Sequence, residues 1–279
     1  MKILDAFLFY NELDLLKVRL EFLGPLVDHF IISEANIDFS GKKKEYILNE
    51  ALISTLPFNE KIIYHREFIA LNSPSWVWKK IKYIRKRKSY LWKIQDAQRN
   101  AILKKLLSFS DTDILIFGDL DEFPSEDAVN FAKSKLSYQD YISDYHPIYI
   151  CNQKFYYYNV NHSAKEGDYF GTAITSIQHA NLIKPHKIRS EKDRFPNIPN
   201  GGWHFSYFMQ AADIERKIIA ICEVENLNSF KEISQSEILK KMGSGRDLFN
   251  RNIPLSDAGK VLIPKKLLSI LAKYLPDCI

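Results

Sequence analysis

The chain has 279 residues, of which 46% are hydrophobic and 26% charged, a composition that excludes a disordered or fibrous protein and is typical of a globular one. The formal net charge of +5 is too small to indicate a nucleic-acid-binding protein, so we expect no nucleic-acid partner. Three widely spaced cysteines, Cys151, Cys222 and Cys278, indicate neither a disulfide framework nor a zinc site, and they favour a reducing compartment.

Strand-like and helix-like segments alternate in the first half of the chain. Ile3 to Tyr10 has the apolar pattern of a strand, and Glu12 to Leu23 places leucines at helical spacing. Further strands are predicted at His29 to Ser33 and Lys61 to His65, and a long amphipathic helix from Tyr90 to Phe109. This β-α-β order predicts an α/β fold in which helices flank a mostly parallel sheet.

The pattern changes after Pro124. Tyr141 to Val160 carries strand-like stretches, and Gly201 to Phe208 is a glycine-flanked aromatic segment. Helices are predicted from about Ala211 to Cys222 and from Ile263 to Leu275, where leucines lie at helical spacing. We expect this last helix to close the core, although its interleaved lysines would also suit a helix on a membrane. Without a clear linker, the chain is expected to form one domain over residues 1–279.

The most informative motif lies at residues 114–124, where an apolar run meets three carboxylates. Asp119, Asp121 and Glu122 end the run, and Pro124 prevents the strand from continuing. Hard oxygen ligands suit Mn²⁺ or Mg²⁺, and a half-filled coordination sphere leaves room for nucleotide phosphates. Because open α/β sheets bind ligands at the carboxyl ends of strands, we expect Asp119 and Asp121 to hold a divalent cation. The alternative is a loop that only caps the next helix, with Ser125 as N-cap.

A basic segment runs from Lys79 to Lys93. Between its ends lie Lys80, Lys82, Arg85, Lys86, Arg87 and Lys88, and no acidic residue. Such a segment can steer anions or contact an anionic membrane, or it can form a solvated helix face. The sequence shows neither a secretory leader nor an apolar run long enough to span a bilayer. We therefore expect a cytoplasmic protein that can attach peripherally to a membrane through this segment.

Several motifs, in order along nearly the whole chain, resemble those of glycosyltransferase family 17. They are Asn11 to Leu16, Val27 to Ala35, Gln98 to Ile102, Gly118 to Pro124, Gly202 to Tyr207 and Gly245 to Phe249. The family includes the β-1,4-mannosyl-glycoprotein 4-β-N-acetylglucosaminyltransferases. Where the family carries a His-x-Glu pair, this chain has Glu223-Val224-Glu225, and it lacks the expected membrane anchor and stem. These departures predict a bacterial or viral relative with a different acceptor.

The resemblance implies a GT-A-like, Rossmann-like fold and an inverting transferase. Residues 1–124 would form the half that binds the nucleotide sugar, and residues 125–279 the acceptor-side half with C-terminal helices. The donor would be a UDP-sugar, with UDP-GlcNAc the first expectation. The acceptor would be a hydroxyl group of a glycan on a glycoprotein, on a lipid or in a polysaccharide.

Roles in the reaction follow from the same motifs. Mn²⁺ or Mg²⁺ on Asp121, with help from Asp119, would neutralise charge on the departing UDP. His204 is expected as a third metal ligand or a phosphate donor, or else as a core histidine. An inverting transfer also needs a base for the acceptor hydroxyl, for which Glu225 is the first candidate and Glu122 the second. Either carboxylate can instead be a surface or capping group.

Further residues are expected to contact the donor. Glu12 and Glu34 follow the first two strands, where a uracil or ribose would lie, and Arg99 can reach the same pocket or the diphosphate. The alternatives are helix capping for Glu12, a lysine pair for Glu34, and a tie between helix and sheet for Arg99. Trp203 can stack on a sugar ring or fill the core.

Two other functions remain open from the residues alone. An Asp-x-Asp phosphatase would use the first aspartate as nucleophile, but Phe123 stands where that motif needs threonine or valine. A non-catalytic carbohydrate- or nucleic-acid-binding module would use the aromatic residues and the basic segment.

Overall fold

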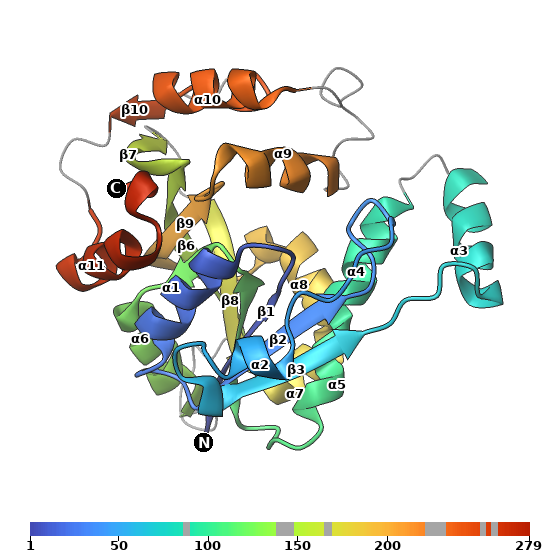
Figure 1. Cartoon of the computed structure of the whole chain (residues 1–279). Helices are drawn as coiled ribbons and strands as arrows, with labels where there is room; N and C mark the ends of the chain where they lie inside the picture. Colours follow the sequence, from blue (N-terminus) through green and yellow to red (C-terminus); the bar gives the residue numbers. More distant parts are fainter. Residues whose placement is uncertain (86–89, 138–147, 165–168, 221–232, 252–254, 258–261) are drawn as a thin grey trace.

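The computed structural model describes residues 1–85, 90–137, 148–164, 169–220, 233–251, 255–257 and 262–279 (Figure 1). The strands are β1 (Ile3–Leu8), β2 (His29–Ala35), β3 (Ile62–Glu67), β4 (Ile114–Asp119), β5 (Glu122–Pro124), β6 (Ile148–Tyr157), β7 (Asn159–Ala164), β8 (Tyr169–Ser176), β9 (Asn197–Ser206) and β10 (Leu255–Asp257). The helices are α1 (Leu13–Leu23), α2 (Glu50–Ile53), α3 (Pro74–Arg85), α4 (Leu91–Ala101), α5 (Leu103–Leu106), α6 (Glu126–Ser137), α7 (Ile177–Ile183), α8 (Pro185–Ser190), α9 (Ala211–Ala220), α10 (Gln235–Ser244) and α11 (Lys265–Tyr274).

The predicted α/β class is confirmed, and the first half of the chain forms a parallel sheet. The strands lie in the order β3-β2-β1-β4, with Ile3 beside Ile114 and Leu8 beside Asp119 in the central pair. Parallel neighbours need long crossover connections, which the helices between these strands supply. The predicted long helix is divided into α4 and α5 at Ile102.

The second half makes the sheet mixed rather than mostly parallel. Strand β8 runs antiparallel to both β4 and β6, and β7 and β10 continue the antiparallel edge. The reason is the short connection between β6 and β7, where Tyr158 adopts a left-handed conformation with φ of 67°. A hairpin of that length can join only antiparallel strands, and no helix pattern lies between these strands in the sequence.

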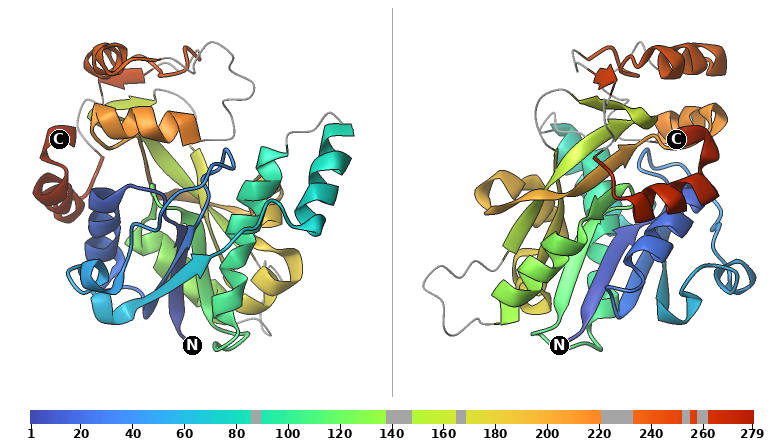
Figure 2. Two further views of the ribbon diagram at one scale, coloured as in Figure 1. Left: turned by 45° about the vertical axis from the view of Figure 1, so that its right-hand side comes forward. Right: turned by 90° about the vertical axis from the view of Figure 1, so that its left-hand side faces the viewer.

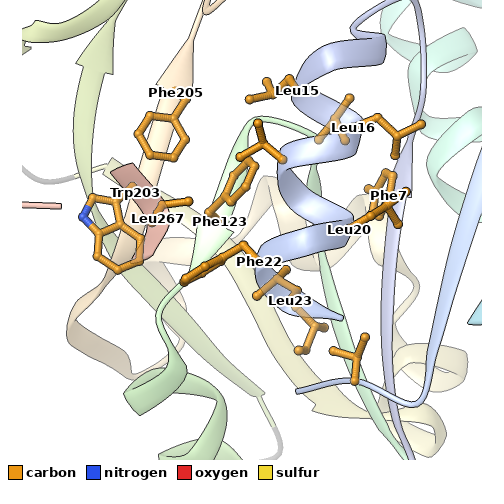
Figure 3. Packing of buried hydrophobic residues seen from close by; sticks show 14 of the residues in the cluster. Phe7, Leu15, Leu16, Leu20, Phe22, Leu23, Phe123, Trp203, Phe205 and Leu267 are labelled. Atoms are coloured by element: carbon orange, nitrogen blue, oxygen red, sulfur yellow. The ribbon is translucent and has the colours of Figure 1, made fainter. Parts of the chain in front are cut away.

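Helices cover both faces of the central strands, because β1 alternates its apolar side chains between two cores. Ile3 and Phe7 pack in a cluster that includes residues of α1, α6 and α11. Leu4 and Ala6 face the opposite cluster, built with α5 and α7. Figure 3 shows Phe22 of α1 beside the aromatic side chains of β5 and β9 in the first cluster. As predicted, the C-terminal helix α11 closes this core, with Leu267 and Leu271 fully buried.

The short strand β5 pairs with β9, and this pairing places the acidic motif next to His204. Glu122 lies opposite His204, and the amide of Phe205 donates to the carbonyl of Asp121 at 2.8 Å. A Cβ atom at Gly202 would come within 1.9 Å of the carbonyl of Phe123, and its φ is 139°, so only glycine fits this crossing. The predicted cap is also present, since the hydroxyl of Ser125 accepts from the amide of Ala128 at 3.1 Å.

A buried arginine on α1 holds the turn between β4 and β5. The Nη1 group of Arg19 donates to the carbonyls of Asp119, Leu120 and Glu122 at 3.2, 3.2 and 2.6 Å. Its remaining nitrogens bind both carboxylate oxygens of Asp5 at 2.8 and 2.7 Å, and both side chains are fully buried. The planar guanidinium therefore satisfies three turn carbonyls and one buried carboxylate at once.

Replacing Arg19 by methionine should destabilise the fold by about 3–5 kcal/mol, because Asp5 would be left buried and unpaired. Urea denaturation measures the free energy of unfolding. The control is Lys17→Met on the same helix, whose pair with Asp14 is solvent-exposed and should cost under about 1 kcal/mol. Equal losses for the two variants would contradict this role of Arg19.

Candidate active site

A cavity of about 180 Å³ opens at the carboxyl ends of β1 and β4. Its lining residues are Leu8, Tyr10, Glu12, Phe39, Gln95, Asp119, Leu120, Asp121, Tyr169, His204 and Lys217. The structure thus brings together Glu12, Asp119, Asp121 and His204, four of the predicted site residues. A neighbouring cavity of about 170 Å³ shares Glu12, but its lining includes acidic side chains and no lysine, arginine or histidine. Of these two cavities among the described residues, the first has the positive groups that an anionic ligand needs.

Asp119 is held by two arginines. The Nη2 group of Arg189 lies 2.9 Å from its Oδ2, and the Nη2 group of Arg99 donates to both oxygens at 3.3 and 3.2 Å. Burial raises the pKa of Asp119, but the positive charges of Arg189 and Arg99 outweigh it and lower this pKa to about 2. Arg99, predicted to reach the donor pocket or to tie helix and sheet, makes this contact from the last turn of α4.

Glu122 is locked inside the protein. It is fully buried, both of its oxygens bind Arg189 at 2.6 Å, and one of them also accepts from the amide of Asp119 at 3.1 Å. A carboxylate in this position cannot approach an acceptor hydroxyl, so the geometry does not support the predicted role as a base. Instead Glu122 fixes Arg189, which in turn fixes Asp119.

Asp121 faces the other side of the cavity. Its Oδ1 lies 3.5 Å from Nε2 of His204, and its Oδ2 lies 3.3 Å from the ammonium group of Lys217. Burial raises the pKa of Asp121, but Lys217 and His204 more than offset this and hold it well below its usual range. Lys217 also lies 2.8 Å from Oε1 of Glu12, so its ammonium group bridges two carboxylates. Glu12 occupies the N-cap position of α1, yet its side chain does not cap the helix.

Asp121 and His204 are the two side chains near this turn that could hold a divalent cation. In the part of the chain that the structure describes, no three histidine, cysteine, aspartate or glutamate side chains are grouped to hold a metal ion. Asp121 and His204 do form a carboxylate–imidazole pair, and Nδ1 of His204 is buried without a hydrogen-bond partner. One or two carboxylates completed by substrate phosphates are a usual arrangement for Mg²⁺, and Asp121 would supply such a carboxylate. Asp119, predicted as a co-ligand, is turned towards its arginines.

Glu34 and Trp203 do not line the cavity. The carboxylate of Glu34 is fully buried and binds Lys44, the amides of Ile47 and Leu48, and the hydroxyl of Tyr64. Trp203 packs edge-to-face on Phe22 in the core, with ring centroids 6.0 Å apart (Figure 3). For both residues the structure agrees with the alternative considered from the sequence: Glu34 pairs with a lysine, and Trp203 fills the core. Glu225 lies outside the described residues.

Sequence reasoning missed Arg189 and Lys217, the two cations that organise the site. Arg189 stands in a stretch with lysines at 184, 187 and 192, and nothing in that pattern marks it as buried. A signal did exist for Lys217. It lies three residues after Ile214, on the buried face of α9, where a lysine needs a buried partner.

A comparison with protein families decides the class of this protein. The sequence model of glycosyltransferase family 17 matches residues 1–264. The chain belongs to glycosyltransferase family 17. A search of curated proteins finds no match. Among solved structures the chain is similar to a mannose-6-phosphate isomerase from Helicobacter pylori, with 14% sequence identity and a TM-score of 0.34 over 66% of this chain and 77% of that one. That similarity is too slight to bear on fold or function.

Membership of glycosyltransferase family 17 confirms the resemblance seen in the motifs. The protein is a glycosyltransferase, an enzyme that uses a sugar donor and a glycan acceptor. Of the functions considered from the sequence, this membership supports the transferase. Among the described helices, none combines the length and apolarity that crossing a bilayer requires.

The lowered pKa of Asp119 predicts an acid-sensitive contribution to stability. Because the pKa falls from 3.8 to about 2 on folding, the contribution is present above pH 3.8 and is lost as the pH falls through about 2. With the side chain 35% exposed, we expect about 1 kcal/mol after solvent screening. Urea denaturation of wild type and Asp119→Asn between neutral pH and pH 2 should show the difference in unfolding free energy becoming smaller below pH 3.8. A difference that does not change with pH would contradict the ion pairs.

Proposed function

We propose that this protein transfers a sugar, GlcNAc in the first instance, from a UDP-sugar to a glycan hydroxyl with inversion at the anomeric carbon. The observation that carries the proposal is the meeting of fixed cations and carboxylates at one cavity. Lys217 lines the cavity beside Asp121, and Arg99 and Arg189 hold Asp119, another lining residue, from two further helices. With a divalent cation bound beside Asp121, a nucleoside diphosphate would have the charge that such a site binds, and it would lie where α/β sheets usually place nucleotides.

Stabilisation of the departing diphosphate is the main chemical task of such an enzyme. Mn²⁺ or Mg²⁺, held by Asp121 and His204, would supply Lewis-acid stabilisation when bound. Lys217 lies beside this pair with a pKa that Glu12 and Asp121 raise above its usual value despite burial, so it stays charged at neutral pH. Positioned positive groups of this kind stabilise charge that develops in the transition state.

Other residues near the cavity would position the donor and activate the acceptor. Glu12 keeps Lys217 in place and is close enough to the cavity to contact the nucleoside. Arg99 and Arg189 set the orientation of Asp119, which would contact the donor directly or through water. Since Glu122 is locked by Arg189, the base proposed for the acceptor hydroxyl is Glu225.

Donor binding should raise the melting temperature only when a divalent cation is present. The experiment is a thermal-shift panel of UDP-, GDP-, CMP- and dTDP-sugars with Mn²⁺ or with a chelator. UDP-GlcNAc with Mn²⁺ should stabilise wild type, and Asp121→Asn should abolish this shift. The matched control Asp127→Asn, on the exposed first turn of α6, should keep it. If no nucleotide sugar raises the melting temperature, the proposed function is contradicted. If the shift is equally large in chelator, the proposed need for a divalent cation is contradicted.

Replacing Lys217 by methionine should lower kcat/KM for UDP release from UDP-GlcNAc by about 100-fold, the usual cost of losing one positioned donor in a transition state. Arg216→Met on the same helix is the control, because Arg216 is 67% exposed and its guanidinium pairs with Asp213 at 3.3 Å on the surface. Its activity should stay within about twofold of wild type. A Lys217→Met enzyme with wild-type kcat/KM would show that the ammonium group takes no part in the reaction.

A further inference from the structure

Helix α3 exposes an apolar face on the outer side of the molecule. Figures 1 and 2 show this helix beyond α4, away from the central sheet. Val77, Trp78 and Ile81 are 43%, 70% and 38% exposed, and their spacing places them on one side of the helix. Trp76 is buried on another side, where it packs edge-to-face on Tyr90 with ring centroids 5.8 Å apart. The helix is thus anchored by one face and leaves an aromatic and aliphatic face in solvent.

Positive charge surrounds this face. Lys80 and Lys82 are exposed and flank the three apolar side chains on the helix. Phe68, which precedes the helix, is 73% exposed. From Phe68 to Gln95 the sequence has no aspartate or glutamate. It has these eight basic residues: Lys79, Lys80, Lys82, Arg85, Lys86, Arg87, Lys88 and Lys93.

We propose that the exposed face of α3, formed by Val77, Trp78 and Ile81 with Lys80 and Lys82, docks on an anionic lipid bilayer. Tryptophan is the side chain most suited to the interface between headgroups and acyl chains, and flanking lysines pair with anionic headgroups. A symmetric dimer through this face would place the lysines of one copy against those of the other. A single-stranded nucleic acid would use stacking surfaces, which Val77 and Ile81 do not provide.

The position of this surface relates it to the candidate active site. Helix α4 follows α3 in the chain and carries both Gln95, which lines the cavity, and Arg99, which binds Asp119. A bilayer in contact with α3 would therefore lie on the side of the molecule from which α4 reaches the cavity. Resting on the proposed function, this arrangement favours an acceptor glycan that is attached to a lipid.

Vesicle sedimentation tests the docking surface without any sugar transfer. Wild type should sediment with vesicles of phosphatidylcholine mixed with phosphatidylglycerol and remain in solution with phosphatidylcholine alone. Trp78→Ala and the pair Lys80→Glu with Lys82→Glu should each weaken binding about tenfold or more. The matched controls are Leu239→Ala and Lys240→Glu on α10, where both side chains are exposed, and they should bind like wild type.

The outcomes separate this proposal from the proposed function. Variants that lose vesicle binding should keep the metal-dependent shift with UDP-GlcNAc, because none of their residues lines the cavity. Equal vesicle binding by wild type and the α3 variants would overturn the docking surface. So would a dimer in lipid-free solution that light scattering detects in wild type and that Trp78→Ala abolishes, since the face would then belong to a second copy.

Discussion

The guanidinium of Arg19 is the constraint on which the site depends. A turn that leaves a buried strand end exposes carbonyl oxygens to the interior, and such groups must be paired. Arg19 pairs three of them from α1, and Asp5 in β1 balances its charge. One buried side chain therefore ties the first helix, the first strand and the acidic turn together. The carboxylates of Asp119 and Asp121 diverge from this turn, whose backbone Arg19 holds.

The carboxylates of the acidic motif contact different cations on the two sides of the turn. Arg189 binds Asp119 and Glu122 together, whereas Asp121 turns to His204 and Lys217. Each carboxylate at the cavity is thus matched with a positive group before any ligand arrives. This near balance of charge reduces the repulsion that a bare acidic cluster would exert on a diphosphate.

The fold was predictable where local patterns suffice. Apolar runs separated by helical spacing indicated β1 to β4 with their helices, and the tail helix followed from its leucines. The α/β class was predictable, but beyond β4 the strand directions are mixed, because β6 runs parallel to β9 and antiparallel to β7 and β8. The sequence pattern of a strand shows which faces are buried, but it does not show whether the strand runs parallel or antiparallel to its neighbours. Here the short turn at Tyr158 reverses the chain between β6 and β7. Similarly, helical spacing alone could not reveal the break at Ile102 between α4 and α5.

The sequence by itself determined the acidic strand end, the alternation of strands and helices, and the family motifs, because each depends on residues close together in the chain. Only the tertiary structure decided which cation meets which carboxylate. Arg189 is 70 residues from Asp119, and Lys217 is 96 residues from Asp121. Local periodicity contains no information on such partners. The packing of α8 and α9 against the sheet selects them, and the cost of leaving a buried charge unpaired keeps them there.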